Sequence, residues 1–379
     1  MSQRTEIQSA MRNQPWLVPW PKSDLSPVKE CPVCASTRRS LLYEDLADNV
    51  FYCAPGKWTS YSCSDCGSMY LDPRPSSTSI HMAYTTYYTH EMSSQRMDYA
   101  LLNTVLKLRR RLINGYNSWR YSCNEVPRSR LGWIFLSLAW PLNLQLDRNY
   151  RHLPKLPKNG GALLDIGCGS GGFLMTALTC GWKATGVDFD HKAVQICRSQ
   201  GLDVLHGGVE LFEGQVGLFD VITCSHVIEH LPDPLGMLKA CQNLLKPGGQ
   251  LWLETPNIDS LGHREYRRNW RGLEPPRHLV IFNSKSLKGA LNATGFVRIS
   301  SKATPSSLLK LSKSSQNIKL GRAIGLNYEF SSFDIWNIRR KILLQMFKPS
   351  YREFLTVVAF KAGDQYTNTD MISDAVPAE

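Results

Sequence analysis

Four cysteines near the amino terminus have the residue type and the spacing of metal ligands. Cys31 and Cys34 form one C-x2-C pair, and Cys63 and Cys66 form another. Two intervening residues allow both sulfurs of a pair to face one ion, so the two pairs together predict tetrahedral zinc in a closed, structural site. A redox pair or simple free thiols are the alternatives. The long stretch between the pairs predicts an inserted hairpin around residues 50–61.

A glycine loop in the middle of the chain is the second feature with chemical potential. Gly167, Gly169 and Gly172 follow the apolar run 162–166 and satisfy G-x-G-x-x-G. Glycines permit a tight turn and close approach of a ligand, whose polar end would meet free N–H groups at a helix start. Asp188, about twenty residues further on, could accept two ribose hydroxyls. At this point a dinucleotide-dependent enzyme remains open.

The residues around this loop alternate between apolar runs and helical patterns. Such alternation predicts an α/β fold, in which a parallel sheet carries helices on both faces. We expect strands over residues 162–166, 183–188, 203–205, 219–225 and 250–254. We expect helices over residues 173–180, 191–200, 235–245 and 333–347.

Four longer segments occur in a fixed order along this region: LLDIGCGSGGFL, GVDFD, FDVITCSHVIEHLPDP and LLKPGGQLWLETPN. The series resembles the motifs of class I S-adenosylmethionine-dependent methyltransferases, over about residues 161–360. Upstream, CPVC…CSDCGSMYLDPRP resembles a cysteine-rich module that precedes this domain in a subset of bacterial methyltransferases. The resemblance implies a Rossmann-like, seven-stranded sheet whose last strand is antiparallel. The sixth and seventh strands would lie over 295–302 and 353–361, and methyl transfer is favoured over hydride transfer.

The resemblance also implies which residues bind the methyl donor, S-adenosylmethionine. Asp165 would lie near the methionine end, Asp188 would bind the ribose diol and Phe189 would lie against adenine. Relatives often carry an acidic residue after the third strand, where this chain has Gly-Gly-Val ending at Val209. The adenine amino group would then meet backbone or Glu210. The other donor-binding residues implied are Gly167, Gly169, Gly171, Ser225 and His226.

Three histidines are candidates for the reaction itself. A hydroxyl acceptor must lose a proton, and a histidine with a pKa near neutrality suits that task. The candidates are His226, His230 and His278. His278 lies in a P-R-H-L segment that resembles one following the fifth strand in relatives, and it is the preferred base on the acceptor side. For His230, a buried histidine that supports the loop is the alternative.

An arginine-rich loop follows the fifth strand. Arginine can fork onto phosphate or carboxylate, and tryptophan can stack on a sugar or a base. We therefore predict that acceptor binding involves Arg264, Trp270, Arg271 and Arg277. A solvated basic loop is the alternative.

The chain carries 44 Lys and Arg against 32 Asp and Glu, a net charge of +12. The excess falls in that loop and in two insertions, about 81–158 and 304–352. In the first insertion Leu101, Val105, Leu108 and Leu112 recur at helical spacing, and the apolar stretch 131–146 follows, interrupted by Pro141. This pattern predicts a helical cap over the site or a contact with an anionic membrane.

These features divide the chain of 379 residues into five parts. They are an amino-terminal extension (1–30), a zinc-ribbon-like module (31–80), the basic helical insertion (81–158), the methyltransferase domain (159–361) and a disordered tail (362–379). No secretory signal or membrane-spanning stretch is recognisable. We therefore expect a cytoplasmic protein with reduced cysteines, in contact with the inner face of the membrane if the acceptor is lipid-linked.

The sequence predicts methyl transfer to a small or lipid-linked acceptor, at oxygen, with a saccharide of surface-polysaccharide assembly as the leading interpretation. One alternative is an RNA base methyltransferase that uses the zinc module and the basic surface to hold RNA. Another is a non-catalytic scaffold that binds the donor. Nothing in the sequence indicates the oligomeric state.

Overall fold

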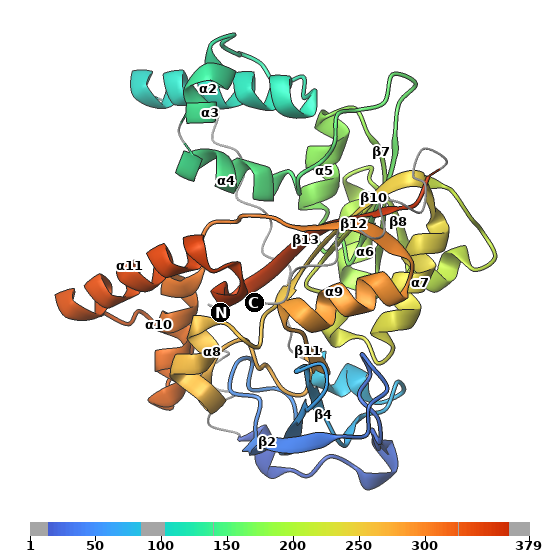
Figure 1. Cartoon of the computed structure of the whole chain (residues 1–379), viewed down its shortest axis with the longest axis vertical. Coiled ribbons are helices and arrows are strands. Elements are labelled where there is room, and N and C mark those ends of the chain that lie inside the picture. Colours follow the sequence, from blue (N-terminus) through green and yellow to red (C-terminus); the bar gives the residue numbers. More distant parts are fainter. Residues whose placement is uncertain (1–13, 85–102, 139, 325, 364–379) are drawn as a thin grey trace.

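The structure is a computed structural model that describes residues 14–84, 103–138, 140–324 and 326–363. Its centre is a seven-stranded sheet of order β12-β13-β10-β9-β6-β7-β8 (Figure 1). The strands are β6 (Ala162–Ile166), β7 (Lys183–Asp188), β8 (Asp203–His206), β9 (Phe219–Ser225), β10 (Leu245–Pro256), β12 (Phe296–Ser301) and β13 (Phe354–Lys361). β13 runs antiparallel to both of its neighbours. The predicted α/β fold with an antiparallel last strand is confirmed.

The two faces of this sheet bury alternate residues of each strand, as a parallel sheet covered by helices requires. Leu163 of β6 packs in the core that includes α5, whereas Leu164 packs in the core on the opposite face with α7 and α9. The helices that cover the sheet are α5 (Gly172–Thr179), α6 (His191–Ser199), α7 (Pro234–Leu244) and α9 (Ser284–Ala293).

Polar side chains define where these helices begin. The Asp190 side chain accepts from the backbone N–H groups of residues 192 and 193 at the start of α6. The Asp233 side chain accepts from the N–H of Gly236, with Pro234 in the first turn of α7. Both caps satisfy backbone donors that the first helical turn leaves without partners.

The cysteine-rich module forms a second, four-stranded sheet of order β11-β4-β3-β2. Its strands are β2 (Arg39–Leu46), β3 (Trp58–Cys63), β4 (Met69–Leu71) and β11 (Val280–Ile281). β11 comes from the loop after β10, so the part of the chain that forms the seven-stranded sheet also donates one strand to the module. The hairpin expected around residues 50–61 does not form there: β2 and β3 pair with each other, and residues 47–57 form the connection between them.

The described part of the amino-terminal extension packs on this module. β1 (Leu25–Ser26) pairs with β5 (Arg74–Pro75), and the ring of Trp20 lies edge-on to that of Trp58 with centroids 5.1 Å apart. Residues 14–30 therefore belong structurally with the module that follows them.

The basic insertion forms three helices above the sheet: α2 (Thr104–Tyr121), α3 (Gly132–Leu138) and α4 (Trp140–Asn149) (Figure 1). Leu101 lies outside the described residues. The apolar spacing in α2 predicted a buried face, but Val105 and Leu108 of that face are exposed. The buried residues of α2 lie in its carboxyl-terminal half. Pro141 stands in the first turn of α4, where a missing N–H costs nothing, and so it does not interrupt a helix.

A disulfide joins Cys123, just after α2, to Cys180 at the end of α5. The expectation that all cysteines are reduced is therefore wrong for these two. The bond fastens the three-helix insertion to the sheet domain. Among the described residues, none of the helices is both long and apolar enough to span a membrane.

The region after β10 adds α8 (Leu261–Tyr266), and the second insertion adds α10 (Leu308–Lys319) and α11 (Ser332–Phe347). α11 extends away from the body of the molecule (Figure 1). Short 3-10 helices are η1 (Pro15–Leu17), η2 (Lys22–Asp24), η3 (Ile80–Tyr84), η5 (Val209–Phe212), η6 (Ile228–His230), η7 (Arg267–Asn269) and η8 (Pro349–Tyr351). The tail from residue 364 lies outside the described residues.

Candidate functional site

The glycine loop joins β6 to α5 at the carboxyl edge of the sheet. Gly169 has a φ of +53°, and a Cβ added there would meet no atom within 4 Å. Gly171 has a φ of +80°, but a Cβ there would lie 2.4 Å from Leu202. Gly169 therefore borders open space where a ligand can approach the backbone, whereas Gly171 is required by packing and by its left-handed conformation.

Asp165 lies beneath this loop and is completely buried. Its Oδ1 pairs with Arg151 and accepts from Thr223 Oγ1 at 2.8 Å. Burial raises the pKa of Asp165, against the opposing effect of Arg151. Its Oδ2 has no hydrogen-bond partner among the described residues. A buried acceptor without a partner is costly, so this oxygen fits a donor group of a bound ligand, such as the ammonium of S-adenosylmethionine.

Asp188 ends β7 beside the same loop. Its Oδ2 accepts from the N–H of Gly169 at 2.8 Å, and its Oδ1 accepts from that of Asp190 at 2.8 Å. These bonds fix the carboxylate, and each oxygen keeps a lone pair for a ribose hydroxyl. The neighbouring Phe189 ring is 63% exposed and lies against Gly208, where an added Cβ would be 2.9 Å from the ring. An exposed ring over a glycine is a platform that an adenine could cover.

After β8 this chain has Gly-Gly-Val at residues 207–209, where relatives often carry an acidic residue. The Glu210 side chain accepts from the N–H of Gly208 at 2.7 Å, and Val209 begins a 3-10 helix beside it. The Glu210 carboxylate therefore lies close to the Phe189 ring, since a Cβ added at Gly208 would meet both.

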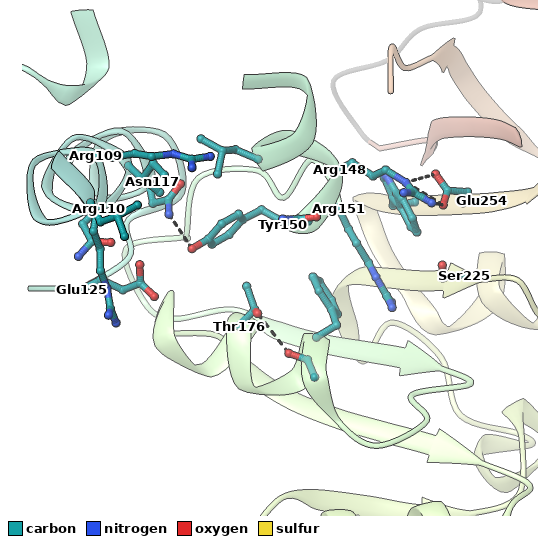
Figure 2. Close-up of a pocket in the computed structure, with 18 residues that line it drawn as sticks. Arg109, Arg110, Asn117, Glu125, Arg148, Tyr150, Arg151, Thr176, Ser225 and Glu254 are labelled. Carbon is teal, nitrogen blue, oxygen red and sulfur yellow. Dashed lines mark hydrogen bonds and ion pairs between the residues drawn. The ribbon is translucent and has the colours of Figure 1, made fainter. Parts of the chain in front are cut away.

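A pocket of about 690 Å³ opens between α2 and the carboxyl edge of the sheet (Figure 2). Its apolar wall includes Ile113, Phe173 and Trp252, and its polar groups include Ser225 and Glu254. Gly172 and Thr176 of α5 also border it. Most of the lining comes from the insertion: Leu106, Arg109, Arg110, Asn114, Asn117, Glu125, Leu146, Arg148, Asn149, Tyr150 and Arg151. The pocket therefore has the carboxyl edge of the sheet on one side and α2 and α4 on the other.

His226 lies next to this pocket, between two carboxylates. Its Nδ1 is 3.2 Å from Glu229 Oε1, and its Nε2 is 3.4 Å from Glu254 Oε1. Burial lowers the pKa of His226, but the hydrogen bonds and charges of Glu229 and Glu254 outweigh it and raise the pKa to about 9. The ring is therefore an imidazolium at neutral pH. Its φ of +55° is unusual for histidine and shows that this position is held by its surroundings.

Glu254 connects His226 to α4. Arg148 donates to both of its oxygens, with Nη2 2.6 Å from Oε1, and Thr356 Oγ1 donates to Oε2 at 2.7 Å. Burial disfavours the charge on Glu254, but His226 and Arg148 outweigh burial and hold its pKa below the usual range. A carboxylate so strongly held is a weak proton acceptor.

His230 and His278 lie side by side below this network, with ring centroids 4.8 Å apart. His278 Nδ1 lies 2.8 Å from the carbonyl oxygen of Gly272 and must donate to it, which leaves Nε2 as an acceptor. Burial lowers the pKa of His278 to about 4, so the ring is neutral at pH 7. Ligand atoms of Glu229, His230 and His278 lie within 4.8 Å of one another, close enough to share one cation. Neither His230 nor His278 lines the pocket.

The arginine-rich loop does not reach the pocket either. Trp270 is 1% exposed and donates from Nε1 to Glu353 at 3.1 Å, and Arg277 is fully buried beside Asp48 and Glu274. Arg271 pairs with Glu274. Arg264 donates to the carbonyl of Asp259 and lies over the Tyr351 ring. The polar atoms of Trp270 and Arg277 are thus already used inside the protein, and the acceptor-binding role expected of these residues stays a prediction.

The four predicted metal ligands come together. Cys31 Sγ is 3.6 Å from Cys66 Sγ, Cys34 Sγ is 3.5 Å from Cys63 Sγ, and all four sulfurs lie within 4.8 Å of one another. Bonds of about 2.3 Å to one tetrahedral ion would place the sulfurs roughly 3.8 Å apart. The donor set therefore fits zinc. Cys53, whose thiol belongs to the same module, lies outside this cluster and by the carbonyl of Ala83.

Sequence reasoning missed the residues that link α4 to the sheet: Arg148, Arg151 and Glu254. Glu254 belongs to the LLKPGGQLWLETPN segment, but the other two are common surface residues in a basic stretch. Each of the two arginines pairs with a buried acid elsewhere in the chain. Arg148 pairs with Glu254, which is 106 residues away, and Arg151 pairs with Asp165, which is 14 residues away.

The chain resembles known methyltransferases in sequence. Residues 142–301 match a family model described as a methyltransferase domain. A ubiquinone biosynthesis O-methyltransferase of Aromatoleum aromaticum is 38% identical over 105 residues, which are 26% of this chain and 45% of that protein. Its counterpart in Xanthomonas campestris is 39% identical over 106 residues, 26% of this chain and 44% of that protein. The chain spans about half the length of the curated relatives it matches.

Solved structures of the same kind are also similar. A SAM-dependent methyltransferase from Archaeoglobus fulgidus aligns with 59% of this chain and 93% of its own, with 23% identity and a TM-score of 0.41. The motif series, the seven-stranded sheet and the matched family model agree with one another. Residues 142–301 of this chain therefore resemble a methyltransferase domain.

Proposed function

We propose that this protein transfers a methyl group from S-adenosylmethionine to a hydroxyl oxygen of a small-molecule acceptor bound beneath α2 and α4. The carrying observation is that the pocket and the glycine loop meet at one edge of the sheet. Ser225 of β9 and Gly172 of α5 line the same pocket as the α2 and α4 helices. The name of the curated relatives, which are O-methyltransferases, supports oxygen as the acceptor atom.

The residues around the loop offer complementary charges for the donor. Asp165 has an oxygen without a partner among the described residues, and the neighbouring Arg151 guanidinium borders the pocket. An amino-acid group would meet the acid through its ammonium and the arginine through its carboxylate. Asp188 would hold the ribose hydroxyls and Phe189 would cover the adenine. When bound, the donor supplies an electrophilic methyl group, so the protein's main task is to align the acceptor with it.

The charge of His226 suggests how the acceptor is activated. An imidazolium cannot take a proton from the acceptor, but it stabilises negative charge that develops on an oxygen beside it. Glu229 and Glu254 hold the ring in place through its two nitrogens. We infer that His226 acts as this electrostatic group, rather than as a general base. The acceptor hydroxyl would lose its proton to the solvent to which the pocket opens, and His226 would stabilise the resulting oxyanion until the methyl group is transferred from the sulfonium. The buried position of His278 gives it a supporting role in the loop.

We also propose a zinc ion held by Cys31, Cys34, Cys63 and Cys66. Its contribution would be structural, because four thiolates fill a tetrahedral ion. The same module carries β4, which pairs with β11 from the loop after β10. Zinc would therefore hold in place the loop that contains His278. A saccharide acceptor and an RNA acceptor stay predictions, because no contact in the pocket favours either one.

Isothermal titration with S-adenosylmethionine tests the central proposal. The wild-type chain is expected to bind the donor, and Asp188→Ala is expected to weaken binding by at least about tenfold, since it removes both ribose contacts. Asp203→Ala, at the opposite end of the neighbouring strand β8, is the matched control and should bind normally. Absence of binding by the wild-type chain, or equal binding by Asp188→Ala, would contradict the proposal.

A further inference from the structure

The outer side of α11 carries a stripe of exposed apolar side chains. Its members are Phe333, Trp336, Leu343, Leu344 and Phe347, and Phe333 and Phe347 are 69% and 81% exposed. Their spacing is that of one helical face, because 3.6 residues make one turn. On the helix, all five fall within an arc of roughly 100°. We call this set the α11 stripe.

The opposite side of α11 is attached to the protein. Ile338 and Gln345 are the buried residues of this 16-residue helix. Gln345 Nε2 donates to the carbonyl of Tyr351 at 3.0 Å, and Lys341 Nζ lies 2.7 Å from Glu265 Oε2 of α8. The helix is therefore anchored through the side opposite the α11 stripe, and the stripe itself is exposed. Figure 1 shows that α11 extends from the edge of the molecule.

Positive charge surrounds the stripe. Arg339 and Arg340 are exposed, and Lys348 follows the last turn, whereas Asp334 is the one acidic residue in the helix. The Arg340 guanidinium lies within the arc of the stripe, 5.6 Å from the Trp336 ring. An apolar face that includes aromatic rings and is bordered by basic side chains matches helices that lie in a membrane interface.

The α11 stripe could be covered by a second copy of the chain or by a lipid bilayer, and the positive charge around it distinguishes the two. A second copy of the chain, packed stripe to stripe, would bring two sets of arginines together and bury Arg340 without an acidic partner. A bilayer that contains anionic lipids would instead neutralise these cations while the aromatic rings enter the headgroup region. We propose that the α11 stripe is a docking surface for an anionic lipid bilayer. This inference is independent of the proposed function, because it concerns where the protein lies and not what it methylates.

Co-sedimentation of the full chain with vesicles tests the proposal. We expect binding to vesicles of phosphatidylcholine mixed with phosphatidylglycerol, little binding to phosphatidylcholine alone, and weakening by salt. The double variant Trp336→Asp, Phe347→Asp should lower vesicle affinity at least about tenfold, because it places charges in the apolar part of the interface. Arg340→Glu should lower it about tenfold, since it reverses one charge at the surface.

The matched control is Trp133→Asp with Leu138→Asp on α3, where both side chains are also exposed. This control should bind vesicles as the wild type does, and all variants should keep the circular dichroism spectrum of the wild type if they are folded. Failure of the wild type to bind mixed vesicles overturns the proposal. So does loss of binding in the α3 control alone, which would assign the membrane to the first insertion. A dimer in sedimentation velocity that Trp336→Asp dissociates, without vesicle binding, would assign the stripe to a second copy.

Discussion

Arg277 and Asp48, which are 229 residues apart in sequence, form a fully buried ion pair. Arg277 Nη1 lies 3.1 Å from Asp48 Oδ2, and Arg277 Nε lies 3.0 Å from Glu274 Oε1. Burial opposes the charge of Asp48, but Arg277 outweighs burial and holds the pKa of that carboxyl below its usual value. The pair fastens the cysteine-rich module to the loop that follows β10.

Arg277→Ala should therefore be strongly destabilising. It leaves the buried charge of Asp48 without its ionic partner and Glu274 with Arg271 alone, and breaking a buried pair costs about 3–5 kcal/mol in comparable sites. Urea unfolding followed by circular dichroism measures the free energy of unfolding. Arg339→Ala, at an exposed position of α11, is the control and should change it by less than about 0.5 kcal/mol. A loss in Arg277→Ala no larger than that of the control would show that the ion pair does not hold the module.

The pKa of His226 should be measurable by NMR. The protein has 9 histidines, and His226→Gln identifies the signal that belongs to this ring. Because the folded pKa is raised to about 9, the ring should stay protonated as pH rises through 6.5 and lose its proton only near pH 9. The stability that this charge contributes is present below pH 6.5 and is lost as pH rises through about 9.

The cause of that shift has its own test. Glu229→Gln removes one of the two negative partners, so the pKa of His226 should fall in this variant. Glu213→Gln, at an exposed position far from the ring in sequence, should leave it unchanged. A signal that titrates near 6.5 in the wild type would contradict the electrostatic role of His226.

Metal analysis of the purified chain should find about one zinc per molecule. Cys63→Ser should lose the metal and lower stability, because one sulfur of the cluster is gone and metal binding is coupled to folding. Cys53→Ser should keep the metal, since Cys53 lies outside the cluster. Retention of zinc by Cys63→Ser would place the ion elsewhere.

Thiol counting tests the bond between Cys123 and Cys180. After denaturation and removal of metal, alkylation without a reductant should modify nine of the 11 cysteines, and all of them after reduction. The two half-cystines are separated by 57 positions, and a loop of that length corresponds to at most about 4 kcal/mol of stabilisation in the chain-entropy model. Cys180→Ser should lower the free energy of unfolding in the absence of reductant. Eleven free thiols before reduction would show that the bond does not form.

Much of the sheet domain is predictable from the amino-acid sequence. The expected strands 162–166 and 219–225 coincide with β6 and β9, and the expected helix 333–347 differs from α11 by one residue. These elements are local: their apolar periodicity and their glycine or proline ends lie within a few residues of one another. The two cysteine pairs can also be recognised from sequence, because each C-x2-C turn consists of four consecutive residues.

The direction in which a side chain faces is much harder to predict. Val105 and Leu108 have the spacing of a buried face, yet both are exposed. Trp270 and Arg277 resemble ligand-binding residues, yet both are buried in contact with acids of the protein. A basic or apolar pattern has the same appearance in sequence whether its partner is a ligand, solvent or a distant segment.

The sequence by itself thus determined the fold class, the glycine loop after β6 and the pairing of four cysteines in two C-x2-C turns, since each depends on neighbouring residues. Only the tertiary structure decided which charges meet: Arg148 with Glu254, Arg151 with Asp165, and His226 between two glutamates. It also decided that β11 joins the cysteine-rich sheet and that the α11 stripe points outward. The physical reason is that burial and pairing of charge are set by contacts between distant segments, and these exist only once the chain has folded.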